Sequence, residues 1–403
     1  MKITVSDLHV KVQDWWLLGP TFAYCPEKDR PDCGSLLMCA SVNNGGDSGV
    51  GNFLWRSFDE GKTWEEVGFL EKSFMYDKNG SMLKMGGNAA LYTDKNAGVI
   101  LFTSNEMYWN KNNFQSTRSM SRAFYRLSFD NGRTWTDKKF IITPGGTLDN
   151  QIPDVVFGRN FALSMSSQTL PADDGTLLVA LQVQIVDENG NLVEPAGFHF
   201  FKCGALHAKW DGENAKYDWT MGNYVRVTPD KSTRGVYEPT FGKRGDGNYI
   251  MIMRNSNLKA PSVIGQKFYS VSSDNGYTWS EPKPLTYDDG TTMYSSSSVP
   301  KLWAHSNGKL YYIGVINDKN PEENLPRYPL CIAEVDRENC TIIKDTVTVI
   351  DTKRPHHSDE RGGVNADYSN HGIYEDSMGH IVVYAPYTND KGERGLNRYE
   401  IEV

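Results

Sequence analysis

The stretch Ser128-Phe129-Asp130-Asn131-Gly132-Arg133-Thr134-Trp135 decides the fold, because the same pattern recurs at residues 57–64 and 272–279. In each copy the Asp carboxylate can accept backbone N–H bonds across a bend, and the Gly two residues later can adopt a positive φ without a Cβ clash. The tryptophans that close the copies lie 71 and 144 residues apart, and 144 is twice 72. The spacing predicts a repeat protein in which one copy has been lost between the second and the third.

A second repeat consists of a turn that ends in Gly and is followed by an apolar strand. It occurs at Gly34, Gly98, Gly175, Gly247, Gly308 and Gly379. Each instance is typical of the first hairpin of a four-stranded unit. Trp64, Trp135 and Trp279 follow the first, second and fourth glycine, and we expect these side chains to be buried near the outer hairpins of those units. Six hairpins predict an all-β, six-bladed β-propeller that occupies residues 1–403 as a single domain. We expect Lys2–Val5 and Tyr399–Val403, two short β-prone segments, to pair and close the ring.

Composition excludes several classes of partner. The 403 residues carry a net charge of −8 and no run of basic residues, so neither nucleic acid nor an anionic membrane is an expected partner. No segment approaches the ~20 apolar residues of a membrane-spanning helix, and Met1–Asp7 lacks the apolar core of a signal peptide, which leaves the cellular location open. The six cysteines have no metal-binding spacing; Cys25–Cys33 and Cys331–Cys340 could form disulfides, or all six could be reduced packing residues.

The eight-residue repeat resembles the Asp box of the sialidase superfamily, with the pattern Ser-x-Asp-x-Gly-x-Thr-Trp in all three places. In that family the box is a hairpin turn on the outer part of a propeller blade, remote from the active site. The resemblance therefore implies the fold, and the chemistry has to be sought in other residues.

Glu238-Pro239 and Arg254 flank one predicted hairpin, so their side chains should lie side by side. The pair resembles the sialidase arrangement in which the Glu is the base for a Tyr nucleophile and the Arg binds the substrate carboxylate. The alternative is a simple ion pair across two strands. Arg327, just before a strand of the fifth unit, resembles a further family arginine, because two arginines can grip one carboxylate.

Tyr368-Ser369 resembles the Tyr-Ser motif of the sialidase nucleophile. An anomeric carbon that bears a carboxylate repels an Asp or Glu nucleophile, whereas a neutral Tyr, deprotonated as it attacks, is not repelled. A packing Tyr is the alternative. For the general acid the family uses an Asp on a loop shortly before the first box, and Asp47 lies ten residues before Ser57; it could equally be an ordinary turn residue.

Polar residues also stand at the ends of the apolar strands that follow the repeated glycines, as a ring of pocket residues would require. Asn105 and Gln182 are the two predicted to contact substrate in addition to the arginines. His371 lies near Tyr368 in sequence and is a further substrate-binding candidate, or a base for lyase or inverting chemistry. No metal or other cofactor is predicted.

The stretch Leu17–Thr21 occupies the place where sialidases carry their first carboxylate-binding arginine, and it contains none. The resemblance otherwise implies an exo-acting glycosidase for a terminal acidic sugar, sialic acid or a relative, with a glycan as partner and Asp47, Glu238 and Tyr368 as catalytic residues. The alternatives are a polysaccharide lyase or uronic or deoxy-sugar glycosidase on the same fold, and a non-catalytic carbohydrate-binding propeller. The sequence predicts no oligomeric state.

Overall fold

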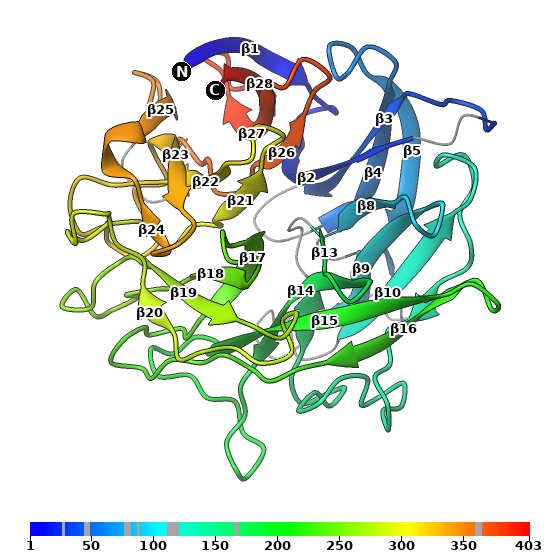
Figure 1. Ribbon diagram of the computed structural model, residues 1–403, viewed down its shortest axis with the longest axis horizontal. Helices are drawn as coiled ribbons and strands as arrows, with labels where there is room; N and C mark the ends of the chain where they lie inside the picture. Colours follow the sequence, from blue (N-terminus) through cyan, green and yellow to red (C-terminus); the bar gives the residue numbers. More distant parts are fainter. Residues whose placement is uncertain are drawn as a thin grey trace.

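The structure, a computed structural model, describes residues 1–25, 29–43, 49–75, 82–86, 89–110, 121–164, 169–358 and 365–403. These residues form six antiparallel sheets arranged around a central axis, as predicted (Figure 1). One short 3₁₀-helix, η1 (Lys344–Thr346), is the only helix among them, and the described part of the chain has no helix long and apolar enough to cross a membrane.

The blades follow one another along the chain, and each blade is one antiparallel sheet. Blade 1 contains β2 (Trp16–Tyr24), β3 (Leu36–Asn43), β4 (Gly49–Ser57) and β5 (Glu65–Lys72). Blade 2 contains β6 (Phe74–Met75), β7 (Met82–Gly86), β8 (Ala90–Asp94), β9 (Val99–Asn110), β10 (Ser121–Ser128) and β11 (Lys139–Phe140). Blade 3 contains β12 (Ala162–Ser164), β13 (Leu170–Pro171), β14 (Thr176–Gln184), β15 (Phe201–Asp211) and β16 (Lys216–Met221).

The second half of the ring repeats the pattern. Blade 4 contains β17 (Tyr237–Lys243), β18 (Tyr249–Arg254), β19 (Lys267–Ser272) and β20 (Lys283–Pro284). Blade 5 contains β21 (Lys301–Ala304), β22 (Leu310–Val315), β23 (Leu330–Asp336), β24 (Thr341–Ile342) and β25 (Thr348–Asp351). Blade 6 contains β26 (Gly372–Glu375), β27 (Ile381–Thr388), β28 (Arg394–Glu402) and the N-terminal strand β1 (Lys2–Val10).

The two chain ends close the ring, as the sequence predicted. Strand β1 pairs antiparallel with β28, so that Lys2 lies opposite Glu402 and Ile3 opposite Ile401. The termini consequently lie next to each other in the sixth blade (Figure 1). This pairing gives blade 6 its fourth strand and leaves no blade incomplete.

The repeated glycines sit where the first hairpin of each blade turns. All six have φ between +64° and +85°, a region that costs Gly nothing and strains other residues. In the boxes, Thr134 donates its N–H and its hydroxyl to the Asp130 carboxylate at 2.8 and 2.6 Å, and Gly132 donates to the Ser128 hydroxyl at 2.7 Å. The boxes at Asp59 and Asp274 make the same bonds, so the motif is a self-contained turn between the third and fourth strands of its blade.

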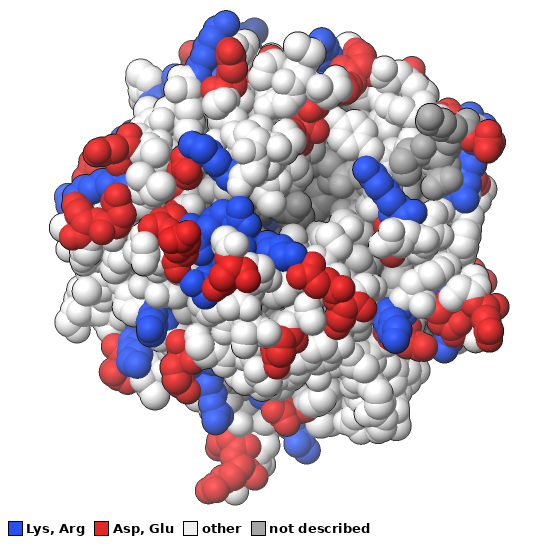
Figure 2. Space-filling view, viewed as in Figure 1, with Lys and Arg blue, Asp and Glu red and all other residues white. Residues whose placement is uncertain are grey.

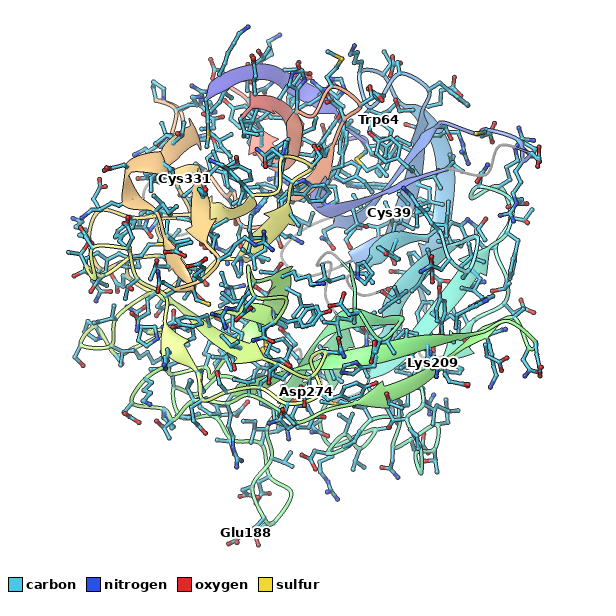
Figure 3. The ribbon with its side chains drawn as sticks, in the orientation of Figure 1. Cys39, Trp64, Glu188, Lys209, Asp274 and Cys331 are labelled. Atoms are coloured by element: carbon cyan, nitrogen blue, oxygen red, sulfur yellow. The ribbon has the colours of Figure 1, made fainter. Side chains whose placement is uncertain are left out.

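The hydrophobic core consists of six layers, each between two neighbouring blades. The box tryptophans pack into these layers away from the axis, as Trp64 shows in Figure 3. Trp279 is buried at 7% exposure and stacks on Phe241 with ring centroids 5.7 Å apart, whereas Trp64 and Trp135 are only partly buried. The prediction of three buried tryptophans is therefore confirmed for Trp279 and too strong for the other two.

Replacing Trp279 by Ala should lower the free energy of unfolding by about 3–5 kcal/mol, because the change removes a large side chain from a packed layer. Trp135→Ala serves as the matched control: it removes the same side chain from the same position of another box, and the smaller buried area should make its effect smaller. Urea denaturation followed by circular dichroism measures both. Equal losses of stability would contradict the difference in packing.

Candidate functional site

Glu238 begins the inner strand of blade 4 in an unusual backbone conformation. Its φ is +48°, and the pairing of β17 with β18 is irregular between Tyr237 and Thr240. A positive φ at a residue other than Gly costs free energy and is found at functional sites that the surrounding structure holds in place. Here Gln182, from blade 3, accepts the N–H of Glu238 through its side-chain oxygen at 2.9 Å. Gln182 thus positions Glu238.

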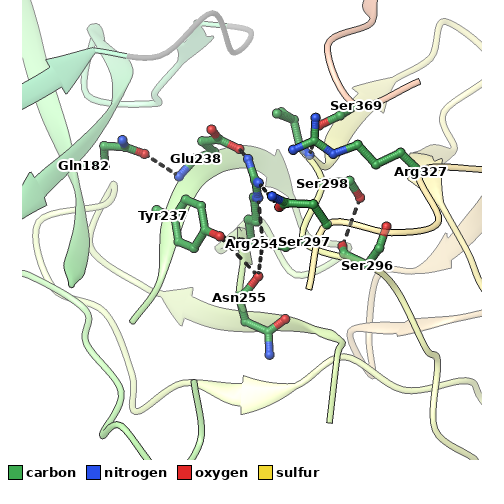
Figure 4. Close-up of polar contacts among 12 residues, drawn as sticks. Gln182, Tyr237, Glu238, Arg254, Asn255, Ser296, Ser297, Ser298, Arg327 and Ser369 are labelled. Carbon is green, nitrogen blue, oxygen red and sulfur yellow. Dashed lines mark hydrogen bonds and ion pairs between the residues drawn. The ribbon is translucent and has the colours of Figure 1, made fainter. Parts of the chain in front are cut away.

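Arg254 lies beside Glu238, as the hairpin spacing predicted. Its Nη1 donates to Glu238 Oε2 at 2.5 Å, its Nε to Ser297 Oγ at 3.0 Å and its Nη2 to Asn324 Oδ1 at 3.0 Å (Figure 4). The guanidinium also lies 4.7 Å from the centre of the Tyr237 ring. Burial is the largest single effect and by itself lowers the pKa of Arg254, but Glu238, Tyr237 and Asp367 together outweigh it and raise that pKa. Arg254 is therefore a fully charged side chain whose donors are engaged by the protein.

Arg327 and Asp367 form a second guanidinium–carboxylate pair next to the first. Their backbones meet in an isolated parallel bridge, and Arg327 Nη1 donates to Asp367 Oδ2 at 2.6 Å. The other oxygen of Asp367 accepts the N–H of Ser369 at 3.0 Å. Arg327 Nε is buried and has no hydrogen-bond partner within the described part of the chain. The Arg327 side chain as a whole is 18% exposed, so a ligand could reach other atoms of this side chain but not the buried Nε.

The second pair lines a cavity of about 340 Å³ together with Glu323, Asn324 and Asn365. Since Asn324 also accepts a bond from Arg254, the cavity adjoins the Glu238–Arg254 pair. A larger cavity of about 760 Å³, lined by residues that include Asp318 and Tyr328, shares Asn365 with it. Blades 4, 5 and 6 and their connecting loops thus bring two carboxylates and two guanidinium groups to one place.

Two buried lysines add to the charge of this region. Lys267, opposite Arg254 in the β18–β19 pairing, donates from Nζ to the Ser296 carbonyl at 2.7 Å. Burial, followed by the charge of Arg254, lowers the pKa of Lys267 well below its usual value. Burial also lowers the pKa of Lys301 to about 8, although Glu238 opposes that effect. Both ammonium groups are therefore easier to deprotonate than a lysine in water.

Tyr368 is not among the residues that line the cavity. Its side chain is fully buried in the hydrophobic layer between blades 5 and 6, and its hydroxyl donates to the Thr352 carbonyl at 3.1 Å. Burial, with a contribution from Asp351, raises the pKa of Tyr368 far above 10. These contacts are those of a packing residue, which was the alternative to the nucleophile. The side chain that reaches the cavity from this segment is that of the preceding residue, Asp367.

The remaining predicted site residues are placed as follows. Asn105 is buried, and its side-chain amide donates to the Ala162 carbonyl at 2.8 Å, which joins blades 2 and 3. His371 is buried, with its ring nitrogens 3.0 and 3.1 Å from the carbonyl oxygens of Tyr368 and Ile313. Both ring nitrogens of His371 are thus within hydrogen-bond distance of main-chain carbonyl oxygens in the core. Asp47 lies outside the described residues.

Burial, followed by the charge of Lys301, lowers the pKa of His371 from 6.5 to about 3. Between these two values the unfolded chain binds a proton that the folded chain does not, so this residue lowers stability as the pH falls through that window, by about 1.4 kcal/mol per pH unit. We expect His371→Gln to reduce the slope of unfolding free energy against pH between 6.5 and 4 by that amount. The partly exposed His356 provides the control, His356→Gln; an unchanged slope in the His371 variant would refute the expectation.

Three charged residues of this region were not predicted from the sequence, namely Asp367, Lys267 and Lys301. Charged residues at the ends of otherwise apolar strands would have indicated the two lysines. Asp367 stands next to the predicted nucleophile, and neighbouring residues in extended chain point to opposite sides. Which of the two faces the axis depends on the register of the segment, and a motif match carries no information about that register.

One group of side chains in the described residues could share a metal ion, namely Asp376, His380 and Glu400 in blade 6. Arg398 is ion-paired with Glu400 at 2.9 Å, and this cation disfavours a metal there. All six cysteines are free in this structure, in which neither candidate pair forms a disulfide. Acidic and basic side chains are interspersed around the central hollow in Figure 2, so this face presents no continuous basic surface to nucleic acid.

Comparisons with known proteins agree with the fold. The family model of the BNR repeat-like domain matches residues 53–381. A sialidase from Paraclostridium sordellii is 27% identical over 235 residues, which cover 57% of this chain and 49% of that protein. The chain thus matches about half the length of this curated relative.

Solved structures extend the likeness to nearly the whole chain. The K499G mutant of the NanB sialidase from Streptococcus pneumoniae has a TM-score of 0.64 at 15% identity, with 98% of this chain and 70% of that chain covered. A protein of unknown function from Dyadobacter fermentans has a TM-score of 0.63 at 12% identity and covers 99% of both chains. At these identities the likeness shows the fold alone. The chain therefore belongs to the BNR repeat-like domain family and has the six-bladed propeller fold of the sialidases.

Proposed function

We propose that this protein is a glycoside hydrolase that removes a terminal sugar from a glycan. The observation that carries the proposal is the position of the Glu238–Arg254 pair, which contacts Asn324, next to the cavity that Asn324, Asp367 and Arg327 line. Hydrolysis of a glycosidic bond requires carboxyl groups that move protons and stabilise positive charge at the anomeric carbon. The matching relative is named a sialidase, which adds a glycosidase precedent within the same family.

Glu238 is the proposed base, which would take a proton from the water that attacks the anomeric carbon. Its ion pair with Arg254 and the hydrogen bond that its N–H donates to Gln182 fix its position. The Arg327 side chain, which is 18% exposed and lines the cavity, would bind an oxygen of the substrate, either a hydroxyl or the carboxylate of an acidic sugar. Asp47, the sequence candidate for the general acid, would protonate the leaving oxygen. Tyr368 has no part in the proposed mechanism because of its burial.

A panel of 4-nitrophenyl glycosides tests the proposal. The panel should include sialic acid, uronic acid, deoxy-sugar and neutral sugar glycosides, each incubated with the wild-type protein and with Arg327→Met. We expect wild-type turnover of at least one acidic or deoxy-sugar glycoside and a loss of at least tenfold in kcat/KM in the variant. Saturable binding of sugars without turnover of any glycoside would instead favour the carbohydrate-binding alternative.

A further inference from the structure

We infer that Asp367 is a specificity-determining residue that excludes sugars whose anomeric carbon carries a carboxylate. The inference deepens the proposed function, on which it rests for the location of the sugar site. Its first observation is that Arg327 already forms an ion pair within the protein. A family arginine that grips a substrate carboxylate must offer it charge and paired donors, and in this chain Asp367 already occupies Nη1 at 2.6 Å.

The charge balance of the site points the same way. Arg254 is ion-paired with Glu238, and Arg327 is ion-paired with Asp367. The net charge of these four side chains is therefore zero. The segment Leu17–Thr21 supplies no third arginine. Neither Lys267 nor Lys301 is among the described residues that line this cavity, and burial lowers the pKa of both. The cavity therefore lacks the excess of positive charge that a site for a carboxylate would need.

The position of Asp367 makes its charge effective. Its side chain is 32% exposed and lines the cavity, whereas Tyr368 beside it is fully buried. Ser369 and Arg327 each hold one of its oxygens, so the carboxylate is fixed in the site. A second carboxylate that approached Arg327 would meet a like charge within a few ångströms, and a like charge at that range opposes binding.

The preferred substrate class follows from this arrangement. A sugar of the aldose type, whose anomeric carbon carries hydrogen, brings no carboxylate to Arg327. Its ring hydroxyls could donate to Asp367 and accept from the Arg327 guanidinium, since both side chains line the cavity. A uronic acid also belongs to this class, because its carboxylate is at the other side of the ring. Sialic acids, with the carboxylate on the anomeric carbon, do not.

Binding measurements test the inference without relying on turnover. Isothermal titration calorimetry compares N-acetylneuraminic acid with its methyl ester, which has the same shape and no charge. We expect wild-type protein to bind the acid no better than the ester. Asp367→Asn should bind the acid at least tenfold more tightly than wild type does, with the ester unchanged. Asp318→Asn, which removes an exposed charge from the adjoining cavity, should leave both affinities as they are.

Two outcomes would overturn the inference. One is wild-type protein that already binds the acid at least tenfold more tightly than the ester. The other is an Asp367→Asn variant, folded by circular dichroism, that still binds the acid no better than the ester. Failure of the proposed function is a different result, since it appears as the absence of glycoside turnover by the wild-type enzyme.

Discussion

Glu238→Gln should lower kcat/KM for the best glycoside of the panel by at least a hundredfold. A positioned base contributes about 10²- to 10⁴-fold to rate, and the amide that replaces it cannot accept a proton. The change keeps the size of the side chain and an oxygen that can still accept the bond from Arg254 Nη1, now 2.5 Å long. Steady-state kinetics at several pH values measures the loss.

Two further variants make that result specific. Glu213→Gln changes an exposed carboxylate in the outer turn of blade 3 and should leave the rate unchanged. Tyr368→Phe should keep kcat/KM within about threefold of wild type, because its hydroxyl donates to the Thr352 carbonyl inside the core. A hundredfold loss of kcat/KM in Tyr368→Phe would support Tyr368 as the nucleophile. Full activity in Glu238→Gln would show that Glu238 is not the base.

Arg254→Met should lower the free energy of unfolding by about 3–5 kcal/mol and abolish turnover. The side chains of Arg254 and Glu238 are 7% and 16% exposed, and loss of one partner leaves the other charge buried without compensation. The change also removes the donors to Ser297 and Asn324. Guanidinium chloride unfolding measures the stability.

The double variant Glu238→Gln with Arg254→Met should recover part of the lost stability, since no buried charge then remains unpaired. Arg133→Met is the surface control: it breaks an exposed ion pair with Asp32, and such pairs contribute little. A loss in Arg254→Met no larger than in Arg133→Met would show that the buried pair does not stabilise the fold.

The fold could be predicted from the sequence because its signals are local. Each repeated Gly must turn with positive φ, and each box Asp bonds to residues within its own eight. Local signals recur once per blade, so their number gives the blade count. The depth of Trp64 and Trp135 could not be predicted, because it depends on how neighbouring blades pack against each turn.

The site could be predicted only where one hairpin determined the geometry. Glu238 and Arg254 end beside each other because a single turn separates their strands. Gln182 was predicted as a pocket residue. Its contact with Glu238, which joins blade 3 to blade 4, was not predicted. The local sequence could not show whether Asp367 or Tyr368 faces the cavity. In the irregular segment before β26, Asp367 lines the cavity and the Tyr368 hydroxyl donates to a carbonyl in the core.

A crystal structure of the protein soaked with the monosaccharide product of its best substrate tests the central claim most directly. The sugar should lie in the cavity lined by Asp367 and Arg327, with an oxygen within hydrogen-bond distance of the Arg327 guanidinium and the anomeric carbon next to Glu238. A sugar bound elsewhere on the propeller, with Glu238 and Arg327 unchanged and uncontacted, would contradict the assignment of this cavity as the glycosidase site.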